Sequence, residues 1–230
     1  MTHAPLCVVA GAGPGNGHAI ARRFLDEGYR VALLARRPNA HASLELARGF
    51  VCDLEDPESI RATFASIRSE LGDPEVLVYN AGPGVWGDIE ELSDESFERA
   101  WRVNALGAFV ASREVIPAMK AAGHGAIVLV GATASLRGMP KTAAFAPAKA
   151  AQRALAQSMA RQLWPGGIHV ALVIIDGIVD LPWLRAELPD RPDEFFVQPD
   201  AVANTVFHLA HQHESAWSFE VEARPYGERW

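Results

Sequence analysis

Short apolar runs alternate along the chain with longer stretches in which apolar residues recur every three or four positions. An uninterrupted apolar run flanked by turn-forming residues is typical of a strand that is buried on both faces. A spacing of three and four positions is typical of an amphipathic helix. The pattern predicts strands at 6–11, 29–36, 49–54, 75–82, 125–132, 168–175 and 217–223. It predicts helices at 16–28, 56–72, 93–122, 143–164 and 199–212.

Helix boundaries support this assignment. Asp56 and Pro57 form a typical helix start, and Gly72 a typical stop. Strands separated by helices indicate a parallel sheet covered on both faces, and right-handed crossovers favour a doubly wound Rossmann sheet. We therefore expect one α/β domain over 1–230, with about seven strands in the order 3-2-1-4-5-6-7.

Composition narrows the classes of function. The chain is 49% hydrophobic and 21% charged, which suits a globular core. Its net charge of −7 makes nucleic acid an unfavourable partner. The longest apolar runs, such as 169–176, are too short to cross a bilayer. The first residues have neither the charged nor the apolar region of a signal peptide, so we expect a cytoplasmic protein.

Cysteine and histidine give no metal-binding pattern. Cys7 and Cys52 stand in predicted strands and are expected to be reduced core residues. His208, His211 and His213 could form a ligand cluster, but a solvated helix end is the favoured interpretation. We expect no metal site.

A glycine-rich segment joins the first strand to the first helix. Its glycines let a pyrophosphate approach the backbone, and the helix start supplies free N–H groups. The sequence therefore predicts a dinucleotide site, although a plain glycine-rich turn would have the same composition. The predicted loop residues are Gly11, Gly13, Pro14, Gly15, Asn16 and Gly17.

The spacing Gly11-x-x-x-Gly15-x-Gly17 resembles the short-chain dehydrogenase/reductase family. Further segments fit the same family in the same order. "YNAG" at 79–82 resembles its N-N-A-G, Asn104 matches its helix asparagine, and "DGIVD" at 176–180 stands where it usually has P-G. Phe145 and Lys149 fall on its Y-x-x-x-K. The resemblance covers essentially the whole chain and implies hydride transfer with a nicotinamide cofactor.

The end of the second strand suggests which cofactor. Ala35 stands where an NAD-binding chain usually has an acid, and Arg36 and Arg37 follow. A guanidinium suits a 2′-phosphate, so we expect NADP(H); two solvated arginines are the alternative. The resemblance implies that adenine and its ribose lie near Asp53, Leu54, Asn80, Ala81 and Gly82, and that Ile178 offers its backbone to the carboxamide.

This sequence has the family residue at only two of the four catalytic positions. The resemblance implies that Lys149 binds the nicotinamide ribose and that Asn104 supports a proton-relay water. The tyrosine position holds Phe145, and the serine position, 13 residues earlier, holds Ala132. Thr133 or Ser135 could supply a displaced hydroxyl. His18, Asp176 and Asp180 could supply protons, although a cap or loop role is favoured for each.

Three functions remain open. The first is an NADP(H)-dependent oxidoreductase acting on a small, partly hydrophobic substrate, with an activated C=C or C=N rather than a simple ketone. The second is a non-catalytic NADP(H)-binding sensor or partner subunit. The third is a carbonyl reductase that uses Thr133 or Ser135.

Two segments bear on substrate and assembly. The region 180–198 mixes proline, charge and bulky apolar residues, and we interpret it as a substrate lid, with ordinary packing of a short helix as the alternative. The helices at about 105–122 and 143–164 resemble the dimerisation helices of the family. A homo-oligomer is therefore expected, a tetramer or a dimer, with Tyr226 and Trp230 packing on a neighbouring subunit.

Overall fold

Seven parallel strands form the central sheet of the computed structural model, which describes residues 4–37, 47–82 and 84–227. The strand order confirms the sequence-based prediction. From one edge to the other the strands are β3 (Ala47–Val51), β2 (Arg30–Ala35), β1 (Leu6–Ala10), β4 (Val76–Tyr79), β5 (Gly125–Ala132), β6 (Ile168–Ile175) and β9 (Glu220–Ala223). Every pair of neighbours is parallel.

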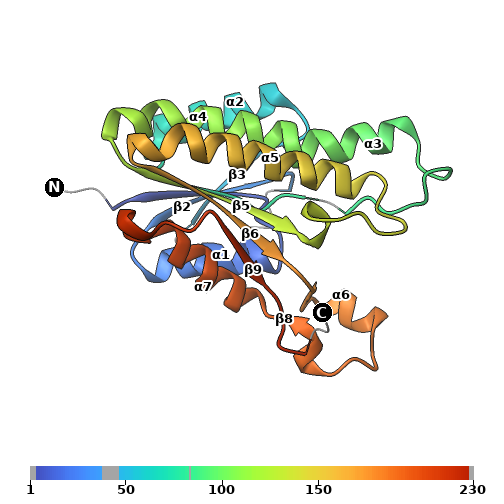
Figure 1. The fold of residues 1–230 in the computed structure, drawn as a ribbon. Helices are drawn as coiled ribbons and strands as arrows, with labels where there is room; N and C mark the ends of the chain where they lie inside the picture. Colours follow the sequence, from blue (N-terminus) through green and yellow to red (C-terminus); the bar gives the residue numbers. More distant parts are fainter. Residues whose placement is uncertain (1–3, 38–46, 83, 228–230) are drawn as a thin grey trace.

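Helices cover both faces of this sheet (Figure 1). One layer contains α2 (Pro57–Leu71), α4 (Gly107–Ala122) and α5 (Phe145–Leu163), and the other contains α1 (Asn16–Asp26) and α7 (Pro199–Ala210). Successive strand residues point to opposite faces. Val8 therefore packs with the first layer and Val9 with the second, so the central strands β1 and β4 are buried and apolar at every position, as the sequence pattern indicated. The chain is a single-domain α/β protein of the Rossmann type.

Local chemistry explains where α2 begins and ends. The Asp56 carboxylate accepts a hydrogen bond of 3.0 Å from the backbone N–H of Glu58, and Pro57 occupies the first turn. Gly72 ends the helix with φ at 90°, a conformation that other residues rarely adopt. Both boundaries agree with those predicted from the sequence.

The predicted helix over 93–122 is not a continuous α-helix. It consists of α3 (Asp94–Trp101), a π-helical turn (Arg102–Leu106) and α4. Within the π turn, the Asn104 side chain donates a 2.9 Å hydrogen bond to the carbonyl of Ala100, four residues earlier. That carbonyl would otherwise accept from the backbone N–H of Asn104. The amide side chain thus stabilises a wider turn at a candidate site residue.

The segment proposed as a lid has structure of its own. It contains β7 (Ile178–Val179), α6 (Pro182–Glu187) and β8 (Phe196–Val197), and the two strands form a small parallel sheet apart from the main one. In Figure 1 this segment lies at one end of the molecule, next to the C-terminal part of the chain. Strands of two residues leave no periodic pattern, so the sequence did not predict them. Short 3-10 helices occupy Thr133–Ser135, Trp164–Gly166, Asp193–Phe195 and Glu214–Ala216.

The two cysteines are buried and the three histidines at the end of the last helix are exposed, as the sequence predicted. Cys7 and Cys52 are buried free thiols, and burial raises the pKa of both. His208, His211 and His213 are exposed at and beyond the end of α7, where His211 lies 2.8 Å from the Tyr29 hydroxyl. Within the described ranges, no three His, Cys, Asp or Glu side chains are grouped so that they could hold a metal ion. Among the same residues, no helix is both long and apolar enough to cross a membrane.

Candidate functional site

A cleft of about 310 Å³ opens at the carboxyl ends of β1, β2 and β4. In parallel α/β sheets this is the edge at which ligands bind. The cleft brings together part of the predicted cofactor set, namely Gly11, Gly13, Arg36, Asp53, Leu54, Asn80, Ala81 and Gly82. Its lining does not include the remaining predicted residues, Pro14, Gly15, Asn16, Gly17, Arg37, Lys149 and Ile178.

The glycine loop is shaped by close backbone contacts. Gly11 has φ at 92°, and a Cβ added there would lie 2.5 Å from the backbone nitrogen of Ala81. A Cβ on Gly17 would lie 2.5 Å from the Gly11 carbonyl oxygen. A Cβ on Gly13 would meet nothing within 4 Å. The loop is therefore packed against its own helix and against β4, and it is open at Gly13, on the cleft.

Asn80 ties the end of β4 to this loop. Its side-chain amide donates a 2.8 Å hydrogen bond to the carbonyl of Gly11. Asp53, on the opposite wall, accepts from the backbone N–H of Glu55 at 3.0 Å while its own N–H donates to Ser59. Asp53 therefore forms a turn and at the same time lines the cleft.

Two arginines stand where the second strand ends. Arg36 and Arg37 are both exposed, and the side chain of Arg36 lines the cleft. Neither guanidinium forms an ion pair with another residue in the described part of the chain. Arg36 is thus available to an anion in the cleft.

The start of α1 is covered by an apolar side chain from the other end of the sequence. A Cβ on Gly15 would lie 2.4 Å from a methyl carbon of Leu181. Asn16, the first residue of α1, has a buried Oδ1 without a hydrogen-bond partner. His18, one residue further into the helix than Gly17, is half-buried, and its backbone N–H donates to the Gly13 carbonyl. The loop after β6 therefore closes over the helix start.

Lys149 lies deep in the molecule, with an exposed fraction of 3%. Its Nζ donates to the Val130 carbonyl at 2.8 Å and to the Gln152 side-chain oxygen at 3.1 Å. Burial lowers the pKa of Lys149 from 10.5 to about 7, because a charged amine loses its hydration in the interior. This lysine therefore does not extend to solvent.

Asn104 and Lys149 meet at Gly82. A Cβ on Gly82 would lie 2.6 Å from Asn104 Oδ1 and 2.7 Å from Lys149 Nζ. Asn104 is fully buried, and its Oδ1 has no hydrogen-bond partner. A buried acceptor without a donor is uncommon in a native protein. The structure thus places an unsatisfied oxygen and a buried amine beside Gly82, a residue that lines the cleft.

Phe145 lies one helical turn before Lys149 and is nearly buried. It forms a small apolar cluster with Ala134 and Ala146, against which Ala132 packs. The indole ring of Trp86 covers it, with ring centroids 5.5 Å apart. The two positions that match the family tyrosine and serine therefore do lie together, and both are apolar.

The nearby hydroxyl groups have other partners. Thr133 donates to an Asp176 carboxylate oxygen at 2.5 Å, and the second oxygen of Asp176 lies 3.1 Å from the Arg224 guanidinium. The Ser135 hydroxyl accepts from the backbone N–H of Ala132 at 3.2 Å. Asp176, at the end of β6, is thus part of a chain of polar contacts between β5, β6 and the residue that follows β9.

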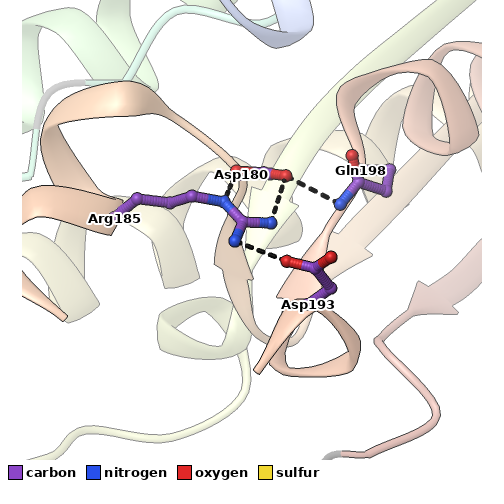
Figure 2. A network of polar contacts seen from close by, with 4 residues as sticks. All are labelled: Asp180, Arg185, Asp193 and Gln198. Carbon is purple, nitrogen blue, oxygen red and sulfur yellow. Dashed lines mark hydrogen bonds and ion pairs between the residues drawn. The ribbon is translucent and has the colours of Figure 1, made fainter. Parts of the chain in front are cut away.

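Asp180 belongs to a second polar network, which spans the segment 180–198. Its carboxylate accepts two hydrogen bonds from the Arg185 guanidinium, from Nε at 2.5 Å and from Nη2 at 2.8 Å (Figure 2). It accepts a third from the Gln198 side-chain amide at 2.8 Å. Arg185 also donates to Asp193 at 2.6 Å. The hydrogen bonds from Arg185 lower the pKa of Asp180. Asp180 is therefore held as a carboxylate that joins the two ends of this segment.

Several residues at the site were not singled out from the sequence. They include Trp86, Gln152, Leu181 and Arg185. Each acts through a contact with a residue that the motif did identify, and the contacts of Trp86 and Leu181 join segments far apart in the chain. Only Gln152, three residues after Lys149 and on the same helical face, could have been found by helical spacing.

The protein has a Rossmann fold, and the glycine-rich loop after its first strand has the form of a nucleotide-binding loop. Residues 6–190 match the family model described as short chain dehydrogenase. The chain belongs to the short-chain dehydrogenase family.

Characterised relatives of this chain are oxidoreductases. The 2-(R)-hydroxypropyl-CoM dehydrogenase of Xanthobacter autotrophicus is 32% identical over 200 residues, which cover 82% of this chain and 79% of that protein. The 3-oxoacyl-[acyl-carrier-protein] reductase FabG of Escherichia coli is 28% identical over 218 residues, 89% of either chain.

Solved structures show the same similarity. A short-chain dehydrogenase from Rhodopseudomonas palustris is 36% identical with a TM-score of 0.82, over 98% of this chain and all of that one. A variant of actinorhodin polyketide ketoreductase with NADPH is 27% identical with a TM-score of 0.88, over 98% of both chains. A metagenomic short-chain oxidoreductase in complex with NADP is 29% identical with a TM-score of 0.82, over 96% of this chain and 97% of that one.

Proposed function

We propose that this protein is an NADP(H)-dependent oxidoreductase that transfers hydride to or from a small, partly hydrophobic substrate. We further propose that the substrate has an activated C=C or C=N bond rather than a simple ketone. The observation that supports this most directly is the apolar cluster that contains Phe145 and against which Ala132 packs. These residues stand where the family has its proton donor and its oxygen-binding hydroxyl.

The cleft suits a dinucleotide. It is open at Gly13, where a ligand can approach the backbone, and it has the amide of Asn80 and the turn at Asp53 as its walls. The unpartnered oxygen of Asn104 and the amine of Lys149 face its inner end at Gly82. A ligand with both hydroxyl donors and acceptors, such as a ribose, would satisfy these two groups. Ile178, Pro14 and Arg37 remain predicted cofactor contacts at its rim.

Arg36 supports NADP(H) over NAD(H). Its guanidinium lines the cleft at the end of β2, with Ala35 in the place where an acid would bind a free 2′-hydroxyl. A planar guanidinium binds phosphate oxygens in pairs. NADP or NADPH also accompanies several of the structurally similar proteins.

Bound NADPH would supply the hydride, and the protein would position it. Lys149 would hold the ribose hydroxyls through an N–H not used by Val130 or Gln152. Phe145, covered by Trp86, would exclude water from the face on which the substrate lies. Such a site offers orientation and a dry environment but no hydroxyl proton at the position of Phe145.

Four hydroxyl groups of the described residues are engaged by other partners. Thr133 is bound to Asp176, and Ser135 is buried against the backbone of Ala132. The Tyr79 hydroxyl donates to the Val103 carbonyl at 2.6 Å, and Tyr29 bonds to His211 on the opposite face of the sheet. These contacts favour a substrate that needs no strong acid over a carbonyl reductase with a displaced hydroxyl.

A second hollow supports a partly hydrophobic substrate. It has a volume of about 470 Å³, shares no residue with the glycine cleft, and includes Ala134 and Ala146, which pack on Phe145. Leu136 and Met139 form exposed apolar parts of its wall. We place the substrate between this hollow and the glycine cleft, with the segment 180–198 as its cover.

Stopped-flow absorbance of NADPH tests the proposal. The protein is mixed with NADPH and with a ketone, an enone or an iminium ion of similar size. We expect oxidation by the enone or the iminium ion at least 10-fold faster than by the ketone, because a positioned general acid contributes roughly 10²- to 10⁴-fold to carbonyl reduction. Tight NADPH binding with no oxidation by any of them would favour the non-catalytic sensor. Ketone turnover at several per second would contradict the proposal.

A further inference from the structure

Gln152 is a fully buried amide on α5 with a single partner for its side chain. Its Oε1 accepts a hydrogen bond of 3.1 Å from Lys149 Nζ, whereas its Nε2 has no partner among the described residues. Leaving a buried donor unsatisfied destabilises the folded protein. A leucine of similar volume would avoid that cost. Packing alone therefore does not explain the residue, and the contact with Lys149 is the one interaction that its amide gains.

Among the residues that the structure describes, the Lys149 amine has no charged partner. The groups that face it are the Val130 carbonyl from β5, Asn104 from the π turn, and Gln152 from its own helix. None of these is ionisable, and burial is the cause of the lowered pKa. An amine in this position exists in both protonation states near neutral pH.

An amide is a suitable partner for such an amine, since it has an acceptor and a donor at the same end of the side chain. Its oxygen can accept from the charged ammonium, and it accepts a hydrogen bond of 3.1 Å from Lys149 Nζ. After a half-turn of the amide, its N–H donates to the lone pair of the neutral amine. A carboxylate would bind only the ammonium, and an aliphatic side chain would bind neither form.

We propose that Gln152 is a positioning residue that holds the Lys149 amine beside Gly82 in both of its protonation states. Its effect on cofactor binding rests on the function proposed above, whereas its coupling to Lys149 does not. The positioning determines how the cofactor site responds to pH, because the amine lies 2.7 Å from the place of a Cβ on Gly82, a residue that lines the cleft.

The coupling is tested first in the protein without cofactor. The chain has three lysines, and Lys120 and Lys141 are exposed, so isotope-labelled lysine gives one buried signal and two internal references. The Cε chemical shift of Lys149 is followed from pH 5 to pH 10. We expect Gln152→Glu to raise its titration midpoint by about one pH unit, because an opposite charge within hydrogen-bond reach favours the ammonium. Gln152→Leu should lower the midpoint.

The matched control is Gln157→Leu, which removes a half-buried glutamine side chain from the same helix. It should leave the Lys149 midpoint unchanged. If Gln152→Leu does not fold, Gln152→Met and Gln152→Glu supply the same comparison. Midpoints that match the wild type in every folded Gln152 variant would overturn the proposal, whatever happens to thermal stability.

The consequence for the cofactor is tested by calorimetry with NADPH at pH 6, 7.5 and 9. In the wild type we expect affinity to fall as pH rises, because the ammonium is the binding form. Gln152→Glu should reduce this dependence, and Gln152→Leu should weaken binding at pH 7.5 by at least fivefold. Absence of NADPH binding in the wild type would refute the proposed function alone. Parallel pH profiles in all variants, with altered midpoints in the apoprotein, would refute the role in cofactor binding.

Discussion

The indole ring of Trp86 lies against the phenyl ring of Phe145, with centroids 5.5 Å apart and planes inclined by 43°. Phe145 is 8% exposed and Trp86 is 64% exposed, so the indole shields the phenyl ring from solvent. Two aromatic rings in this geometry attract each other beyond the apolar area that they bury. The helix position that matches the family tyrosine is thus one half of an aromatic pair.

Restoring two hydroxyl groups should restore carbonyl reduction. We expect the double variant Phe145→Tyr with Ala132→Ser to reduce a simple ketone at least 10-fold faster than the wild type, since one acid and one oxygen-binding donor are worth about 10²-fold or more each. NADPH affinity should change little, because Lys149 and Asn104 are untouched. Steady-state NADPH oxidation and calorimetry measure the two quantities.

Two single variants, Phe145→Leu and Ala132→Ser, serve as controls for this experiment. Phe145→Leu should keep the low ketone rate, because it adds no proton donor. Ala132→Ser alone should give a smaller gain than the double variant, since residues of one catalytic unit are not additive. A wild type that already reduces ketones quickly, or a double variant that gains nothing, would contradict the interpretation of Phe145.

The strand order was predictable because the inner strands are continuous apolar runs and most crossovers contain a predicted helix with clear ends. Asp56 and Gly72, for example, act within a few residues of their own position. The break in the helix at Asn104 was not predictable, because the side chain of one residue replaces a backbone bond there. Periodicity does not distinguish an α-helix from a π turn of five residues.

The site was predictable as a set of positions but not as a set of contacts. Motif spacing placed Phe145, Lys149 and Asn104 correctly on their elements. The contacts of Leu181 with Gly15 and of Trp86 with Phe145 join loops whose paths depend on the whole fold. Trp230, expected at a subunit contact, lies outside the described residues.

Arg36 should determine the choice of cofactor. We expect NADPH to bind at least 10-fold more tightly than NADH, because a hydrogen bond to a charged group contributes about 1.5–3 kcal/mol. Arg36→Ala should remove most of this preference with little effect on NADH. Calorimetry measures all four affinities. Arg161→Ala, an exposed arginine on α5, is the matched control, and equal affinities of the wild type for the two cofactors would contradict the prediction.

Assembly should involve the outer face of α3 and α4. Phe97, Trp101 and Phe109 are 48%, 43% and 41% exposed there. Large exposed apolar side chains gathered on one surface are typical of an interface. Light scattering should give a mass of at least twice the 24.8 kDa of the chain, and Trp101→Glu with Phe109→Glu should reduce it. Tyr226→Ala tests the predicted contribution of the tail. A monomer at micromolar concentration would refute this prediction.

Arg185 should hold the segment 180–198 in place, because its guanidinium joins Asp180 to Asp193 (Figure 2). We expect Arg185→Ala to increase amide hydrogen exchange in this segment at least 10-fold while the main sheet stays protected. Arg191→Ala, which removes a cation lying over the Phe195 ring, should have a smaller effect. Unchanged exchange in the Arg185 variant would show that the backbone pairing of β7 with β8 is sufficient.

The buried amine of Lys149 should destabilise the protein at neutral and acid pH. Its pKa falls from 10.5 in the unfolded chain to about 7 in the folded protein, so between these values the unfolded chain binds more protons. The free energy of unfolding must then rise with pH from about 7 towards 10.5. At 1.36 kcal/mol per pH unit, the contribution between pH 7 and pH 9 is about 2 kcal/mol. Urea denaturation of the apoprotein at several pH values measures it.

Lys149→Met should remove this pH dependence and make the apoprotein more stable at pH 7, because methionine fills a similar volume without a charge to desolvate. The gain should be smaller than the full cost of the charge, since the Val130 carbonyl and Gln152 Oε1 lose their donor. NADPH binding should weaken sharply in the same variant. Lys120→Met, at an exposed position near the end of α4, should leave both the stability curve and the affinity unchanged. A stability that stays flat between pH 7 and pH 9 in the wild type would show that the amine reaches water in solution.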